Sequence, residues 1–160
     1  MTLYLSIISH ILSGAGYYWL LGRADEVLKV SGHRLGTIEI EDALISSREV
    51  AEAAVFGRPD DIKGESIVAF VVIKDDFKGT PEIVGTLRKR IREELGPIYV
   101  PDEIHLVKNL PKTRSGKIMR RVVKAVFLGQ LPGDITTLES SASVEEIKDA
   151  ISEFRKERNR

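Results

Sequence analysis

Pro111-Lys112-Thr113-Arg114-Ser115-Gly116-Lys117 is the stretch of sequence around which the rest of the chain is organised. The chain carries 24 basic and 24 acidic residues, yet the segment between Glu103 and Asp134 contains seven basic residues and no acidic one. The seven are Lys108, Lys112, Arg114, Lys117, Arg120, Arg121 and Lys124. A cationic loop that presents backbone N–H groups through a Ser-Gly pair and leads into a helix suits a phosphate or acyl-phosphate ligand. The stretch therefore predicts an anion-binding loop, with a helix beginning at about Lys117.

This loop is not a Walker A loop. Pro111 and Ile118 occupy the two positions at which that motif requires Gly and Ser or Thr. By charge alone, the segment is also compatible with a solvated basic turn, or with a surface that binds nucleic acid or phosphorylated partners. Aromatic residues make up 6% of the chain and only Phe127 lies close to the basic segment, so base stacking has little support.

Length and composition bound the class of protein. A chain of 160 residues has room for one domain, at the usual ~100–200 residues per domain. The sequence contains no cysteine, which excludes disulfides and thiolate metal sites, and its three histidines are too far apart to suggest a metal cluster. Residues 3–12 are apolar but shorter than the ~20 residues of a membrane span, and no basic residue precedes them as in a signal peptide. We expect a cytoplasmic protein without a membrane partner.

The hydrophobic pattern predicts an α+β domain. The expected strands are residues 17–21, 27–30, 53–56, 67–73 and 103–107. The first two are expected to form a hairpin across the charged turn 22–26, followed by a loop over 31–36. The apolar run 67–73 is unbroken, which indicates a strand buried on both faces. The sum is an N-terminal β-hairpin and then a small sheet of about three strands covered by helices.

Four helices are expected to cover this sheet. Thr37 is expected to cap the first, which ends near Ser46-Ser47. Glu39, Glu41 and Asp42 are expected in its first turn, where acidic residues match the helix dipole. Thr80-Pro81 forms the N-cap and first position of the second helix. The third follows the basic loop, and Ser143-Val144-Glu145-Glu146 is a capping box that opens the last.

Two motifs, taken in this order and spacing, resemble the AMP-forming acyl-CoA synthetases. The first is Gly22-Arg23-Ala24-Asp25-Glu26-Val27-Leu28 followed by Ser31-Gly32-His33-Arg34-Leu35-Gly36-Thr37-Ile38-Glu39-Ile40-Glu41. The second is Pro111 to Lys117 followed by Ile118-Met119-Arg120-Arg121. Within this superfamily of acyl-adenylate-forming enzymes, both are most similar to the acetyl- and propionyl-CoA synthetase branch. The resemblance runs from Gly16 to about Leu138 and implies the fold of the smaller, C-terminal domain of such an enzyme.

The resemblance divides the chain into a non-matching leader (1–15), an AMP-binding enzyme C-terminal domain (16–138) and a C-terminal helical tail (139–160). It implies part of an acetate–CoA ligase, which converts ATP, acetate and coenzyme A to acetyl-CoA, AMP and PPi with the help of Mg2+. In the family, a large N-terminal domain carries the ATP-phosphate loop and the acyl pocket, so the chain is not expected to be active alone. We interpret it as a truncated or frame-shifted product, or as a fragment with a foreign leader.

The resemblance also implies roles for single residues in adenylation, the step that joins ATP and a carboxylate into acyl-AMP. Lys117 matches the catalytic lysine, whose ammonium offsets charge on the carboxylate and the α-phosphate. Asp25 matches the hinge about which the C-terminal domain rotates between the two half-reactions. Arg23 is similar to the arginine that reaches the nucleotide ribose, and Arg34 to the one near the ATP phosphates. Without the family, Asp25 would be a turn former and each arginine a surface ion-pair partner.

The same resemblance implies a second set of residues for thioester formation. Ser31 and Gly32 match the loop that approaches CoA, and Gly allows ligand and backbone to come close. Arg92 matches the arginine that contacts the CoA nucleotide, although by itself it is one more charge on a basic helix face. Main-chain carbonyls bind a cation in relatives, at the positions that match Ile45, Ser47 and Val50, and Ser47 stands where a histidine is usual.

Two other hypotheses stay open at this point. The chain could be a stand-alone, non-enzymatic module that binds phosphate groups or nucleic acid, although we expect no nucleic-acid partner. It could also complete a separately encoded N-terminal domain in trans. Whether the chain is part of one enzyme or completes an enzyme in trans, acetylation of Lys117 by an acetyltransferase would remove the charge on which its role depends, and a deacetylase would reverse this.

Overall fold

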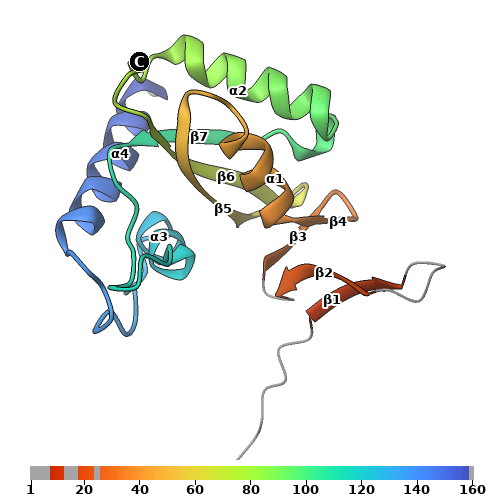
Figure 1. Ribbon diagram of the computed structural model, residues 1–160, viewed down its shortest axis with the longest axis horizontal. Helices are drawn as coiled ribbons and strands as arrows, with labels where there is room; N and C mark the ends of the chain where they lie inside the picture. The colour runs from red at the N-terminus through yellow and green to blue at the C-terminus, as the bar shows by residue number, and fades with distance from the viewer. Residues whose placement is uncertain (1–7, 13–17, 24–25, 159–160) are drawn as a thin grey trace, which may run out of the picture.

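The computed structural model describes residues 8–12, 18–23 and 26–158, which form seven strands, four α-helices and one 3-10 helix (Figure 1). The strands are β1 (Ile8–Leu12), β2 (Tyr18–Arg23), β3 (Val27–Val30), β4 (His33–Gly36), β5 (Val50–Asp60), β6 (Gly64–Ile73) and β7 (Glu103–Val107). The helices are α1 (Thr37–Ile45), α2 (Pro81–Glu94), η2 (Pro97–Tyr99), α3 (Arg120–Phe127) and α4 (Ala142–Arg158). In this part of the chain, no helix has the length and apolarity needed to cross a membrane.

A five-stranded sheet forms the centre of the domain. Its order is β4-β3-β6-β5, and β7 pairs with β6 in parallel while the other pairs are antiparallel. Residues 67–71 of β6 are fully buried, which confirms the prediction from the unbroken apolar run. Successive residues of β5 and β6 point to opposite faces, so each strand contributes to two cores.

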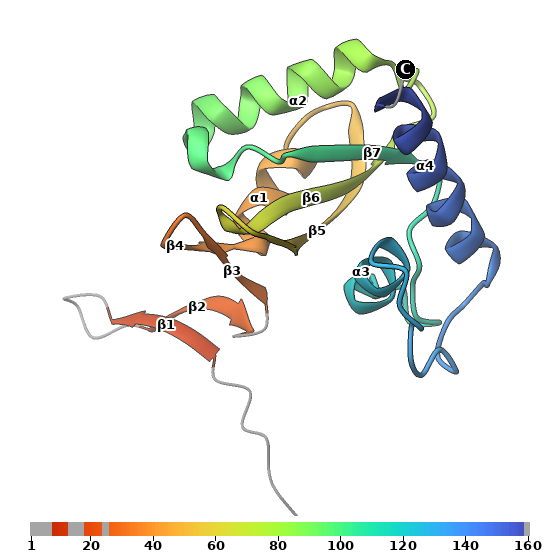
Figure 2. The same cartoon turned by 180° about the vertical axis from the view of Figure 1, so that it is seen from behind.

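Helices cover both faces of this sheet (Figures 1 and 2). On one face α1 and α2 pack through Ile40, Leu44, Leu87 and Ile91. On the other face α3 and α4 pack through side chains that include Val123, Phe127, Ile147 and Ile151. The predicted α+β class with helices on a small sheet is therefore confirmed, and α4 is a packed part of the second core.

The pairing of the N-terminal strands differs from the prediction. β2 pairs with β1, through registers such as Ile11 with Trp19, and these two strands form a separate sheet. β3 pairs with β4, so the predicted hairpin between residues 17–21 and 27–30 is wrong, and the predicted loop over 31–36 is a two-residue turn followed by a strand. Leu28, Val30 and Leu35 are buried in the first core, and this burial selects the local pairing. The main sheet is consequently wider than the three strands expected.

The helix ends follow the prediction at some points and correct it at others. Thr80 is the N-cap and Pro81 the first residue of α2, as predicted. α1 has Gly36 rather than Thr37 as its N-cap. α4 begins at Ala142, so Ser143 is not the N-cap of a capping box. Glu146 instead accepts hydrogen bonds from the backbone N–H groups of Lys108 and Asn109, which join α4 to the end of β7.

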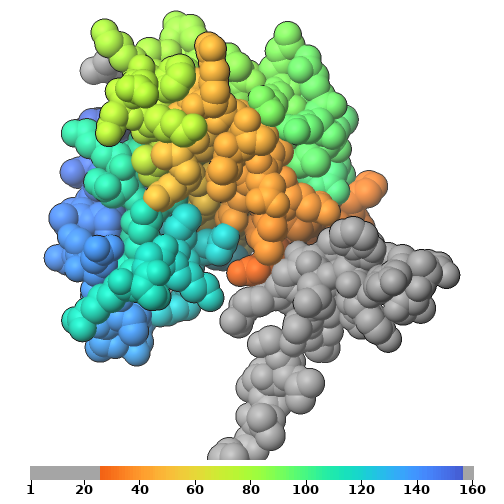
Figure 3. Space-filling model, in the orientation of Figure 1, coloured from red at the N-terminus to blue at the C-terminus, as the bar shows by residue number. Residues whose placement is uncertain are grey.

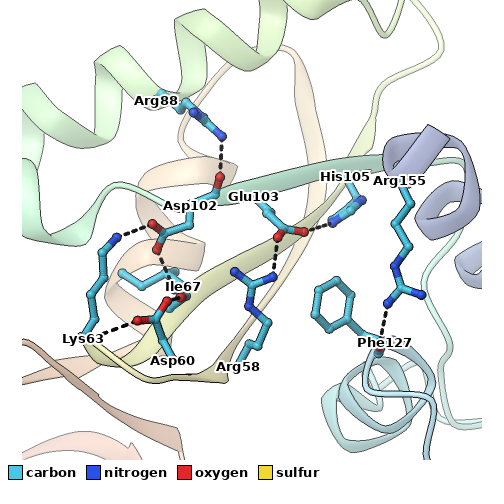
Figure 4. Close-up of polar contacts among 11 residues, drawn as sticks. Arg58, Asp60, Lys63, Ile67, Arg88, Asp102, Glu103, His105, Phe127 and Arg155 are labelled. Carbon is cyan, nitrogen blue, oxygen red and sulfur yellow. Dashed lines mark hydrogen bonds and ion pairs between the residues drawn. The ribbon is translucent and has the colours of Figure 1, made fainter. Parts of the chain in front are cut away.

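His105 of β7 lies inside the second core. Its ring stacks on Phe70 with centroids 4.6 Å apart and contacts Phe154 at 4.5 Å. Its Nε2 atom lies 3.1 Å from the buried Glu103 carboxylate, which also pairs with Arg58 (Figure 4). Burial lowers the pKa of the imidazole, and the Glu103 carboxylate opposes that shift. The core therefore holds a neutral histidine at neutral pH.

Candidate functional site

The Lys117 side of the molecule carries an open cleft of about 700 Å³ between α3 and the sheet. One wall comes from residues of β3 and β5 together with Glu26, Thr37 of α1 and Glu65 of β6. The other wall comes from residues within 113–125 and 130–133. Figure 3 shows the teal surface of the motif next to the orange surface to which α1 belongs. Lys117, Arg121 and Lys124 give the second wall a positive charge, whereas Glu26 and Glu65 lie on the first.

The motif folds as a tight hairpin over residues 111–119, which we call the Lys117 hairpin. Lys112 and Ile118 form an antiparallel bridge, and the Met119 N–H donates to the Pro111 carbonyl at 2.8 Å. Gly116 closes the turn with a φ of 82°, a conformation that glycine adopts without strain. Lys117 therefore lies on the returning arm of a hairpin, and the expected helix begins three residues later, at Arg120.

Four backbone N–H groups of this hairpin already have acceptors in the protein, so they do not form the expected anion cradle. The N–H groups of Thr113 and Gly116 donate to carbonyls of the hairpin itself, and the N–H of Lys117 donates to the Thr113 hydroxyl at 3.1 Å. The Arg114 N–H donates to the Thr137 carbonyl. The hairpin consequently offers its ligand the Lys117 side chain, which is exposed and forms no ion pair with any residue of the described ranges.

An ion pair fastens the end of the hairpin to the first core. Arg120 binds the Glu41 carboxylate through two nitrogens, with Nε 2.6 Å from Oε1. Glu41 is 4% exposed, and its Oε1 also accepts the Val55 N–H at 2.8 Å from the edge strand β5. The hydrogen bonds to Glu41 raise the pKa of Arg120 further. A second carboxylate, that of Glu26, lies 3.9 Å from Arg120 Nη1.

Sequence reasoning missed this role of Glu41, which was assigned to the dipole of α1. The signal was present, because Thr37, Ile40 and Leu44 define the buried stripe of α1 and position 41 falls within it. An acidic residue on a buried stripe requires a cationic partner.

Further contacts use other basic residues of the motif. Lys112, on the first arm of the hairpin and opposite Ile118, pairs with Glu52 of β5. Arg121 donates to the carbonyls of Pro132 and Asp134, which fixes the loop after α3. With Arg120, three of the seven basic side chains are thus bound to protein groups, which weakens the case for a general basic surface.

The residues matched to CoA form the tip of the β3–β4 hairpin. Ser31 and Gly32 are its two-residue loop, with φ values of 49° and 83°. Positive φ at both positions defines a type I′ turn, which fits the twist of the flanking strands. A Cβ atom built on Gly32 meets no atom within 4 Å, so the space above the turn is open to another molecule.

The other predicted site residues are distributed over the domain. Arg34 lies on β4, on the same hairpin as Ser31 and Gly32, and is exposed. Arg92 is exposed near the end of α2, across the sheet from Lys117. Arg23 ends β2, its side chain lies outside what the structure describes, and Asp25 lies outside the described residues.

The predicted main-chain cation site lies in the turn after α1. Ile45 ends α1, and Ser47 and Val50 are buried. The Ser47 carbonyl accepts the Val50 N–H at 3.1 Å, while the Ser47 hydroxyl is buried without a hydrogen-bond partner. Over the described ranges, no three His, Cys, Asp or Glu side chains gather as metal ligands, so a cation here would depend on backbone oxygens.

Comparisons with known proteins agree with this geometry. Residues 39–117 match the family described as AMP-binding enzyme C-terminal domain. The acetyl-coenzyme A synthetase of Pyrobaculum arsenaticum is 57% identical over 142 residues, which cover 89% of this chain and 21% of the relative. The 3-hydroxypropionyl-coenzyme A synthetase of Metallosphaera sedula is 52% identical over the same shares of both chains. The chain thus spans about a fifth of the length of these relatives.

A solved structure gives the same result. The crystal structure of Brucella canis acyl-CoA synthetase superposes with a TM-score of 0.59 and 38% sequence identity, covering 76% of this chain and 21% of that one. The acetyl-coenzyme A synthetase named above is matched in its C-terminal region. The chain belongs to the family of AMP-binding enzyme C-terminal domains.

Proposed function

We propose that this chain is the C-terminal domain of an AMP-forming acetate–CoA ligase, which converts ATP, acetate and coenzyme A to acetyl-CoA, AMP and PPi. The observation that carries the proposal is the Lys117 hairpin, which rests on a frame of hydrogen bonds and ion pairs. It holds an exposed ammonium that has no ion-pair partner among the residues that the structure describes. Identity of 57% to an acetyl-coenzyme A synthetase supports the choice of substrate class. A large N-terminal domain would supply the rest of the active site.

In the adenylation step, Lys117 would stabilise the charge that develops as the carboxylate attacks the α-phosphate of ATP. An ammonium held in place before the reaction contributes most where the charge of the transition state exceeds that of the ground state. We assign Arg34 to the ATP phosphates, Arg23 to the ribose and Asp25 to the hinge. Mg2+ would neutralise the leaving PPi, and the carbonyls of Ile45, Ser47 and Val50 stay candidates for a separate structural cation.

In the thioester step, the Ser31–Gly32 turn would approach the CoA thiol, and Arg92 would contact the CoA nucleotide. The open space above Gly32 supports this role, because no described residue lies within 4 Å of a Cβ atom built on Gly32. Lys117 and the turn lie on different hairpins, which fits a domain that rotates to present one and then the other.

Two properties of the whole enzyme complete the proposal. The enzyme would be cytoplasmic, where its substrates are available. An acetyltransferase would neutralise Lys117, which is exposed on the returning arm of the Lys117 hairpin, and a deacetylase would restore its charge. A nucleic-acid partner is not favoured, since Lys112, Arg120 and Arg121 are bound to protein groups.

The test is a complete enzyme made by joining residues 26–160 to the N-terminal domain of the Pyrobaculum arsenaticum synthetase. It should produce acetyl-CoA from acetate, ATP and CoA. Lys117→Ala should abolish acetate-dependent PPi release and spare the transfer of supplied acetyl-AMP to CoA. Lys108→Ala, a change in an exposed lysine outside the cleft, is the matched control. Equal loss of both half-reactions in Lys117→Ala would refute the assigned role.

A further inference from the structure

The β5–β6 turn lies directly against the Ser31–Gly32 turn. The Ser31 N–H donates to the Lys63 carbonyl at 2.7 Å, and Val30 is paired with Gly64 in the sheet. Next to this contact, the Lys29 N–H donates to the Glu65 carboxylate at 2.6 Å. These contacts come from residues more than thirty positions apart, so the β5–β6 turn sets the position of the tip of the β3–β4 hairpin.

Ser31 needs such support because its backbone is in an unfavourable conformation. Among the described residues, Ser31 is the only non-glycine residue whose φ is positive. A left-handed conformation is unfavourable for a non-glycine residue, and such residues persist where their surroundings hold them. Backbone strain of this kind is concentrated at ligand-binding sites, so the contact that holds Ser31 is expected to matter for ligand binding.

The β5–β6 turn is itself fixed by Asp60. One carboxylate oxygen accepts the N–H groups of Ile62 and Lys63, at 3.0 and 2.9 Å, and the other accepts the Ser66 hydroxyl at 2.5 Å. The hydrogen bonds from Ser66, Lys63 and Ile62 lower the pKa of Asp60 to about 2. Asp60 thus holds the backbone of Lys63 on its N–H side, and the carbonyl on the other side of the Lys63 Cα accepts the Ser31 N–H.

The side chain of Lys63 provides the second tie (Figure 4). Its ammonium pairs with the Asp102 carboxylate at the start of β7. Asp102 also accepts the Ile67 N–H at 3.1 Å, and its carbonyl accepts Arg88 of α2 at 2.7 Å. Lys63 therefore connects the Ser31 peptide to β7 and α2, far from the hairpin that carries Ser31.

We propose that Lys63 is a positioning residue for the thioester step, which holds the Ser31–Gly32 turn in place for CoA through its carbonyl on one side and Asp102 on the other. This inference rests on the proposed function, because the turn is assigned to CoA there. Lys63 does not touch the reacting atoms, and its effect is on the geometry of the turn alone. A displacement of about 1 Å at a reacting group can cost up to ~100-fold in rate.

The test measures both half-reactions in the joined enzyme described above. Lys63→Met should raise the KM for CoA in the thioester step by about tenfold or more and leave acetate-dependent PPi release unchanged. Lys63→Arg retains the positive charge and should have a KM for CoA close to that of wild type. Lys78→Met, which removes an exposed lysine from another turn, should behave as wild type. An unchanged KM in Lys63→Met would overturn the inference, and an inactive wild-type enzyme would instead refute the proposed function.

A second readout needs only this 160-residue chain. The Ser31 amide should exchange its hydrogen several-fold faster in Lys63→Met than in wild type, while amides in the centre of β6 remain protected. Equal exchange at Ser31 in the two proteins would show that the ion pair does not hold the turn, whatever the activity of the joined enzyme.

Discussion

The Lys117 hairpin and the Ser31–Gly32 turn are both hairpin tips, but the protein holds them in different ways. The Lys117 hairpin is tied to the sheet and α1 by side-chain ion pairs, Lys112 with Glu52 and Arg120 with Glu41. The Ser31–Gly32 turn is tied through its backbone, by the strand pairing of β3 and the Ser31–Lys63 hydrogen bond. The first presents a long charged side chain, and the second presents backbone with open space above it.

This difference follows from what each tip would deliver. A charge must be aimed but must also reach its ligand, so a flexible lysine on a rigid base is suitable. A surface that a thiol and its chain must approach needs a fixed backbone without side-chain bulk. The two tips should therefore fail in different ways when their supports are removed.

The largest effect is expected at the base of the Lys117 hairpin. We expect Glu41→Ala to lower the free energy of unfolding by about 2–3 kcal/mol, less than the ~3–5 kcal/mol of a fully buried pair because the Arg120 side chain is 26% exposed. The variant leaves a guanidinium and the Val55 N–H without their acceptor. Urea unfolding of the chain measures the change.

Two controls make this prediction specific. Asp42→Ala removes an exposed acid from the same helix and should change stability by less than about 0.5 kcal/mol. Glu41→Gln retains an acceptor and should be intermediate. If Glu41→Ala and Asp42→Ala are equally stable, the ion pair does not anchor the hairpin.

The next effect concerns the Ser31–Gly32 turn. Gly32→Leu should cost about 1–2 kcal/mol of folding free energy, because leucine is strained at the φ of 83° that the turn requires. Gly32→Asn should cost less, since asparagine tolerates this conformation, yet it fills the same open space. In the joined enzyme both variants should impair the thioester step more than adenylation. Full thioester activity in Gly32→Asn would show that the space above the turn is not used by CoA.

The sequence predicted more of the fold than of these supports. The strands at 67–73 and 103–107 and the start of α2 at Thr80-Pro81 are confirmed because each depends on local composition. The predicted pairing of β3 with residues 17–21 was wrong, because a charged turn between two apolar runs does not identify which neighbour a strand pairs with. The Arg120–Glu41 pair spans 79 positions and the Lys63–Asp102 pair 39, so no local pattern specifies them.

Lowering the pH should destabilise the core around His105 before it affects the β5–β6 turn held by Asp60. Burial lowers the pKa of His105 below 6.5, so the folded state binds fewer protons than the unfolded chain and loses stability as the pH falls below that value. The positive charges of Arg58 and Arg155, which face His105, lower the pKa of the imidazole further, whereas Glu103 raises it. Asp60 keeps its contribution until the pH falls from 3.8 towards about 2.

Urea unfolding across this range measures the first effect. Wild type should lose stability between about pH 7 and 5, and His105→Phe, which fits the aromatic core, should lose less. By hydrogen exchange, α3 and α4 should open before the Ser31 amide does. A wild-type curve identical to that of His105→Phe would show that His105 is not the group that titrates.

The smallest effect is expected at Lys117 itself. Lys117→Ala should change the free energy of unfolding by less than about 0.5 kcal/mol, because the side chain is exposed and forms no ion pair within the described ranges. Urea unfolding of the chain, beside the activity of the joined enzyme, gives the comparison directly. A loss of activity with unchanged stability would mean that the hairpin keeps this ammonium for its ligand and not for the fold. A loss of stability as large as that of Glu41→Ala would mean that Lys117 is one more support, and the distinction between base and tip would fail.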